Sequence, residues 1–235
     1  MKLQRAVPIL WIVLLTASTS GCAGGGFFGY LLTGKDAIPK KYALPDRTTL
    51  VLVDDPDHLL GGPSSANRVA SNVAYYLKEG ETKKAEEQGL PTAKIISIDE
   101  INALRADMGD KTWHLTPIDQ LGKKLGADQV IYVRIDTATL GAINQKVYRP
   151  KATCTVKVID AIHSTRLWPE VGTLIDSSQA PPGHAMRVNM QYDGTDRGGQ
   201  GHESILVQEL CESIGRDVAR LFYDWKSKTV GSTIH

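Results

Sequence analysis

The sequence is poor in cysteine, in aromatic residues and in long apolar runs. With only three cysteines, a disulfide-rich scaffold is excluded. Charges are balanced, with 27 Lys and Arg against 26 Asp and Glu, and no long block carries one sign. We therefore predict no nucleic-acid partner. Aromatic residues make up 6% of the chain, yet Val, Ile and Leu are plentiful enough to bury a core.

Common catalytic and metal-binding motifs are also missing. The chain has no HExxH, no CxxC, no Gly-x-Ser-x-Gly and no phosphate loop, and its six histidines are scattered. We predict that the protein is not an enzyme and holds no metal or cofactor.

The most informative segment is the N-terminal one. Lys2 and Arg5 give it a positive start, residues 6–16 are apolar, and small residues at 17–21 precede Cys22. This order is typical of a secretory signal peptide. The apolar run is shorter than the roughly 20 residues that cross a bilayer.

Ser20-Gly21-Cys22 resembles the lipobox of bacterial lipoproteins, although Thr19 stands where that group usually has Leu. The resemblance implies cleavage of residues 1–21 and lipidation of Cys22. An ordinary signal peptide is the alternative. In lipoproteins an Asp after the cysteine favours the inner membrane, so Ala23 favours a protein that is lipid-anchored to the outer membrane and faces the periplasm.

The rest of the chain predicts an α/β fold: a single domain with a mixed central sheet flanked by helices and a long C-terminal amphipathic helix. We predict a tether at 22–45, the domain at 46–228 and a tail at 229–235. Within the domain, strands are expected at 48–53, 93–98, 129–140 and 147–159, and a return strand is expected to start at 166–168 and to end there or at 175. Helices are expected from Ser64 or Ser65 to 80, from 97 to 105, from 116 to 126 and from 202 to 226.

Local signals support several of these elements. Ser97 with Glu100 forms a capping-box pattern, and Thr116 followed by Pro117 suggests a helix N-cap. The last three strands are joined by short turns, so we predict that they pair antiparallel. An apolar stripe that ends at Trp225 defines the C-terminal helix.

Residues 176–201 are rich in Gly, Pro, Asp and Ser and are predicted to form a long loop that is mobile or functional. Its Gly-rich end at 193–201 suits a flexible loop or an anion cradle before the next helix. His184 and His202 flank the loop, so a zinc site is a minor alternative.

Three further groups of residues are candidates for a role. The turn Asp54–His58 follows a strand and suggests either a solvated turn or a Ca²⁺ site. Trp113 and His114 are possible interaction residues, although Trp113 could instead pack onto a helix start. Cys154 and Cys211 lie among apolar neighbours and are predicted to be buried free thiols, with a disulfide as the alternative.

Three stretches together resemble the CsgG-like and LpoB-like family of bacterial envelope lipoproteins. They are the strand Leu50–Val53 with the helix after it, the run from Leu121 to Ile131, and the strand Thr153–Asp160 before Leu167-Trp168. The resemblance implies a domain without catalysis that binds other envelope proteins or assembles with itself. The 176–201 segment departs from the family pattern.

We therefore predict a membrane-anchored periplasmic lipoprotein that acts as a binding or assembly module of a cell-envelope machine for secretion, transport or cell-wall synthesis. Its partners are envelope proteins, the membrane and, as a further possibility, other copies of itself. One alternative is an envelope hydrolase with a site near Asp54–His58 and the 176–201 loop. Another is a transport accessory for lipid or other hydrophobic cargo.

Overall fold

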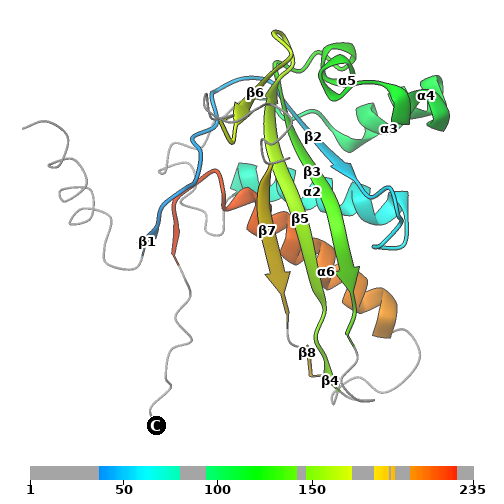
Figure 1. Cartoon of the computed structure of the whole chain (residues 1–235), viewed down its shortest axis with the longest axis vertical. Helices are drawn as coiled ribbons and strands as arrows, with labels where there is room; N and C mark the ends of the chain where they lie inside the picture. Colours follow the sequence, from blue (N-terminus) through cyan, green and yellow to red (C-terminus); the bar gives the residue numbers. More distant parts are fainter. Residues whose placement is uncertain are drawn as a thin grey trace, which may run out of the picture. The chain divides into compact units, whose positions relative to one another are not determined.

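The computed structural model describes residues 37–79, 94–141, 147–170, 183–190, 192–193 and 202–226 (Figure 1). The chain divides into two units. One is Pro39–Asp224, and the other joins the residues before Pro39 to those after Asp224. In the second unit, β1 (Ala37–Ile38) pairs antiparallel with β9 (Trp225–Lys226). The predicted signal peptide and Cys22 lie outside the described residues.

The larger unit contains a mixed five-stranded sheet. Its strands are β2 (Thr49–Asp54), β3 (Gln129–Thr139), β5 (Lys151–Asp160), β6 (Thr165–Trp168) and β7 (His184–Asn189). β2 is parallel to β3, β3 is antiparallel to β5, and β6 and β7 pair with opposite ends of β5. The predicted α/β class and the antiparallel pairing of β3, β5 and β6 are confirmed.

Helices lie on both sides of this sheet (Figure 1). On one side are α2 (Pro63–Glu79) and α6 (His202–Ala219). The other side carries α3 (Ile98–Met108), α4 (Asp110–Leu115) and α5 (Ile118–Lys124), which gather at one end. Elsewhere in the unit, β4 (Val147–Tyr148) and β8 (Tyr192–Asp193) form a small separate ladder.

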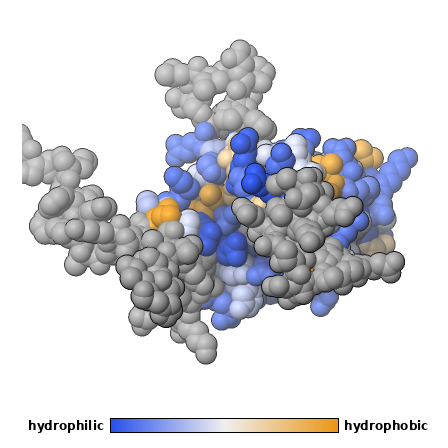
Figure 2. Space-filling model, turned by 90° about the horizontal axis from the view of Figure 1, so that it is seen from below, coloured by the Kyte–Doolittle hydropathy of each residue, from blue (hydrophilic) through white to orange (hydrophobic). Residues whose placement is uncertain are grey.

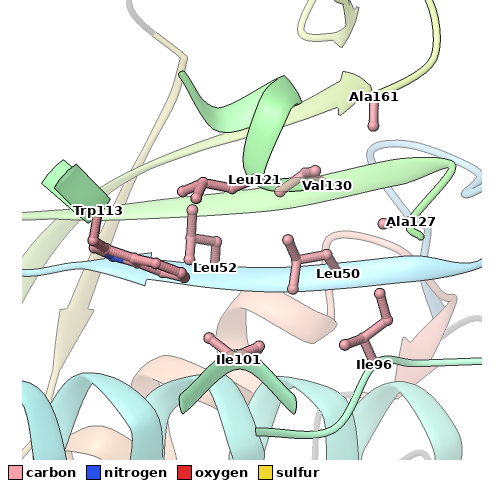
Figure 3. Packing of buried hydrophobic residues seen from close by; sticks show 9 residues of the cluster. All are labelled: Leu50, Leu52, Ile96, Ile101, Trp113, Leu121, Ala127, Val130 and Ala161. Carbon is pink, nitrogen blue, oxygen red and sulfur yellow. The ribbon is translucent and has the colours of Figure 1, made fainter. Parts of the chain in front are cut away.

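Alternating side chains build a core on each face of the sheet. In β5 every second residue is buried, as the sequence alternation predicts. Toward α3–α5, Leu50 and Leu52 of β2 meet Ile101, Trp113 and Leu121 from the three helices (Figure 3). Burying such side chains contributes roughly 1.5–3 kcal/mol each, so this cluster fixes the short helices to the sheet.

Predicted and observed helix starts differ in two places. The Ser97–Glu100 capping box is present, and Gly126 ends its turn with a φ of +70°. However, α2 already begins at Pro63, which suits a first helical position because proline has no N–H to satisfy. Thr116 is not the N-cap of α5. Its hydroxyl donates to the carbonyl of Thr112 and closes α4, a helix that was not predicted.

The strand predicted at 93–98 is wrong. Among its described residues, only Ile95 makes an isolated parallel bridge to Thr49, and Ile98 already starts α3. The capping box at Ser97 leaves too little extended chain for a strand.

The predicted C-terminal helix to residue 226 is too long. α6 ends at Ala219, and a turn leads to the short strand that contains Trp225. The carbonyl of Leu221 accepts the N–H groups of Lys41 and Tyr42, so the backbone there bonds to another segment instead of continuing the helix. Trp225 does not extend the buried stripe of α6, as its sequence spacing had suggested.

The segment predicted as a long loop at 176–201 contains two strands. β7 pairs with β5 from Val156↔His184 to Lys151↔Asn189, and β8 pairs with β4. His184, Met186 and Val188 alternate with exposed residues, which is a two-residue period hidden among Gly and Pro. Residues 171–182 and 194–201 lie outside the described part.

Candidate functional site

A pocket of about 460 Å³ lies where α4 and α5 meet the sheet. We call it the α4–α5 pocket. β2 and β3 supply one wall of it, and α4, α5 and the connection between them supply the other. Its lining residues are Leu52, Val53, Asp54, Trp113, His114, Leu115, Thr116, Pro117, Ile118, Leu121 and Tyr132.

The predicted interaction residues Trp113 and His114 both line this pocket, but in different ways. Trp113 has only 8% of its surface exposed and belongs to the core, with the Arg105 guanidinium 5.9 Å from its ring centre. It is a wall of the pocket rather than a protruding contact. His114 is exposed, and the next residue, Leu115, is 74% exposed. Leu115 is the apolar side chain at this site that sequence reasoning missed.

Tyr132 is the polar centre of the pocket floor. Its hydroxyl donates to Oδ2 of Asp54 at 2.7 Å, and the Lys157 Nζ lies 4.6 Å from its ring centre. Burial, followed by the hydrogen bond to Asp54, raises the pKa of Tyr132 well above its ordinary value. The phenol therefore remains a neutral donor at any physiological pH. The sequence pattern assigns Tyr132 to a strand and gives it no role in a site. The available signal was that Tyr132 is the one aromatic residue in Gln129–Ile135.

Beyond the end that α3, α4 and α5 cover, the sheet face that carries Asp54 and Tyr132 has no helix over it in the described part of the chain (Figure 1). Arg134, Asp136 and Thr137 are exposed there. A β-bulge between Ile135 and Thr137 brings Asp136 onto this face, where its carboxylate accepts the Thr155 hydroxyl at 2.6 Å. The pocket thus opens onto a polar sheet surface. From below, the described surface is mostly hydrophilic, with small apolar patches (Figure 2).

The Asp54–His58 turn has a structural explanation. The Asp55 carboxylate accepts the backbone N–H groups of Leu59 and Leu60, at 2.8 and 2.9 Å, and Asp54 accepts Tyr132. No group of three or more His, Cys, Asp or Glu suited to a metal occurs among the described residues. The Ca²⁺ alternative therefore has no support in the geometry of this turn.

The alternative hydrolase site joined this turn to the 176–201 segment. In the sheet register, Asp54 pairs with Arg134 in β3, whereas β7, the longer described strand of the 176–201 segment, lies on the far side of β5. Three strand spacings separate Asp54 from β7, or about 14 Å. Among the described residues, the Asp54–His58 turn and β7 therefore do not come together, and residues 176–182 and 194–201 lie outside the described part.

His184, the member of the zinc alternative whose side chain is described, is in an aromatic cluster. Its ring centre is 4.9 Å from that of Trp168, which also contacts Tyr42 and Phe222. Burial, and to a smaller extent Lys41, lowers the pKa of His184. The cluster explains His184 as a packing residue, and sequence spacing could not foresee it because its members come from four distant segments.

Both described cysteines are buried and free, as predicted. None of the helices among the described residues is both long and apolar enough to cross a membrane.

Comparisons with known proteins give similar structures only. No family model and no curated protein matches the chain. The lipoprotein GNA1162 from Neisseria meningitidis is 13% identical, with a TM-score of 0.37 over 71% of this chain and 96% of that one. PelC from Paraburkholderia phytofirmans, crystallised as a dodecamer, is 12% identical with a TM-score of 0.37 over 79% and 94%.

A minor lipoprotein from Acinetobacter baumannii is 10% identical, with a TM-score of 0.34 over 74% of this chain and 90% of that one. Several of the similar structures are thus titled lipoproteins. At these identities and TM-scores, the similarity establishes neither a family nor a function. The resemblance to the CsgG-like and LpoB-like family stays a prediction.

Proposed function

We propose that this protein is a lipid-anchored, non-enzymatic binding module of the bacterial cell envelope. In this proposal Cys22 holds it to a membrane, most simply the outer one, and the domain faces the periplasm. The observation that carries the binding role is the α4–α5 pocket, which opens onto an uncovered sheet face and has the exposed Leu115 at its rim. A partner protein docks there.

Site-specific photo-crosslinking in living cells tests the proposal. A benzophenone amino acid at Leu115 is expected to give one or a few discrete adducts. The same group at Lys78, which is exposed on α2, serves as the matched control and is expected to give none. An adduct of twice the monomer mass would identify a second copy of the chain as the partner. Absence of any adduct from Leu115, or the same adducts from both positions, would contradict the proposal.

An apolar cargo is the second candidate occupant of the same pocket. Leu115, Pro117 and Ile118 supply an apolar wall. Native mass spectrometry of the protein extracted in mild detergent would show a bound lipid beyond the anchor if this alternative holds. A single mass that corresponds to the acylated chain would remove it.

A further inference from the structure

The uncovered sheet face carries more positive than negative charge. Residues of one face are identified by the strand register, because every second residue points to the same side. Among the described strand residues, the cations on it come from β3, β5, β6 and β7, and the carboxylates on it are those of Asp54 and Asp136. We call this surface the basic sheet face, and its cations are Arg134, Lys151, Lys157, Arg166 and Arg187.

Three of these cations form a diagonal row. Arg166 is paired with Ile159, two residues from Lys157, and Lys157 is paired with Tyr132, two residues from Arg134. Each step along the row crosses one strand and advances two residues, so the Cα atoms of neighbouring members of the row are about 8 Å apart. Acidic side chains on alternate positions of an extended peptide repeat at about 7 Å, which is close to this spacing.

The cations of the row act on one another. Lys157 is half-buried, and burial together with the neighbouring Arg166 and Arg134 lowers its pKa, although Asp54 opposes the shift. Arg134 contacts Asp136 at 3.6 Å, and 54% of the Arg134 side chain stays exposed. The whole chain has a formal charge of only +1, so this face concentrates positive charge that the rest of the sequence balances.

Tyr132 joins the basic sheet face to the α4–α5 pocket. Its ring lies beside the Lys157 ammonium, and the same residue lines the pocket. An occupant of both surfaces therefore needs carboxylates for the cations and an apolar group for the wall formed by Leu115 and Ile118. An acidic glycan meets only the first requirement, and the nearly buried Trp113 offers no open ring face for a sugar to stack on.

From this juxtaposition we infer that the basic sheet face and the α4–α5 pocket together bind an extended acidic segment of a partner protein. One apolar side chain of the segment enters the pocket, and carboxylates on alternate positions meet the cations of the basic sheet face, Lys157, Arg134 and Arg187 among them. The inference rests on the proposed binding function and specifies the chemistry of the partner.

Selection from a random dodecapeptide display library tests it, with the full chain purified in detergent as the target. We expect enriched peptides to combine several Asp or Glu residues with a Leu, Ile or Phe. Arg134→Glu with Arg187→Glu should lower the affinity for a selected peptide at least tenfold, since both residues are exposed on the face. The matched control is Arg68→Glu with Lys78→Glu, the same charge change on exposed positions of α2.

Circular dichroism and thermal unfolding establish that both double variants remain folded. Enriched peptides without acidic residues, no enrichment at all, or unchanged affinity in the Arg134/Arg187 variant would overturn the inference. Tighter binding of oligogalacturonate than of the selected peptide would also overturn it, in favour of an acidic glycan. If Leu115 crosslinks persist unchanged in the Arg134/Arg187 variant, only this inference fails; if the unaltered protein gives no Leu115 crosslinks, the proposed function fails.

Discussion

At the residue scale, Asp160 shows how a buried carboxylate stabilises a turn. It lies at the end of β5 with 6% of its side chain exposed, accepts the His163 N–H at 2.8 Å and contacts Arg47 at 3.1 Å. The backbone hydrogen bond from His163 is the main cause that lowers the pKa of Asp160 to about 2. Because this pKa is below its ordinary value, the ionised carboxylate stabilises the fold above about pH 4 and less as the pH falls toward 2.

We expect Asp160→Asn to lower the free energy of unfolding at pH 7 by about 1–3 kcal/mol, the usual effect of removing a charged partner from buried hydrogen bonds. Urea unfolding at pH 7, 4 and 3 measures it, and the difference from the unaltered protein should shrink at the lowest pH. Asp107→Asn, at an exposed position of α3, is the control. A difference that is constant across this pH range would contradict the explanation.

The two free thiols give a second prediction at this scale. Burial is the main cause that raises the pKa of Cys154 to about 12 and that of Cys211 to about 11, so almost no thiolate forms at neutral pH. Both thiols should therefore resist N-ethylmaleimide at pH 7 in the folded protein and react fully in urea without a reductant. Intact mass measurements count the adducts. A chain that stays unmodified in urea until it is reduced would instead indicate a disulfide.

Residue types were easier to anticipate from the sequence than their partners. The Asp54–His58 turn was identified as polar, but nothing local indicated that Asp55 would accept the N–H groups of Leu59 and Leu60 while Asp54 accepted a phenol from β3. The Tyr132–Asp54 contact joins residues far apart in the chain, so it depends on the parallel pairing of β2 with β3.

At the element scale, Gly215 sets the close approach of α6 to α2. A Cβ at this position would meet the Cβ of Asn72 and lie 3.0 Å from the backbone nitrogen of Val73. Alanine normally favours a helix over glycine by about 1 kcal/mol. Overpacking of about 1–3 kcal/mol opposes that gain, because backbone cannot move aside as a flexible side chain can.

We therefore expect Gly215→Ala to destabilise the protein despite its better helix propensity, with a lower midpoint of thermal unfolding. Gln208→Ala, at an exposed position of the same helix, is the control and should change the free energy of unfolding by less than about 0.5 kcal/mol. Greater stability in Gly215→Ala would show that the two helices can separate at little cost.

Elements with a strong local period were predictable, and those decided by their neighbours were not. The alternation in β5 is long and uninterrupted, whereas the shorter alternation of β7 lies among Gly and Pro and becomes a strand by pairing with β5. The apolar spacing at the end of α6 continued past Ala219, but the backbone there bonds to residues 41 and 42. Local periodicity contains no information about such distant bonds.

At the scale of the whole molecule, the order of strands and helices was enough to predict an α/β fold with a mixed sheet. The candidate site was only partly predictable. Trp113 and His114 were identified, but the pocket exists because α4 is a separate helix and the three short helices cover one end of the sheet. How much of a sheet face stays open is a property of the assembled layers, so no single segment of the sequence could indicate it.

Membrane attachment is a whole-molecule property that depends, in our proposal, on Cys22. One acyl chain holds a protein on a membrane only marginally, whereas two or more hold it firmly. Alanine at position 22 has no thiol to acylate, so the protein should be released from the membrane or remain an uncleaved precursor. We expect Cys22→Ala to abolish labelling by radioactive palmitate and to remove the mature protein from the membrane fraction. Cys211→Ala, which leaves the lipobox intact, should keep both properties. Palmitate labelling and membrane attachment that survive in Cys22→Ala would show that the chain is anchored elsewhere.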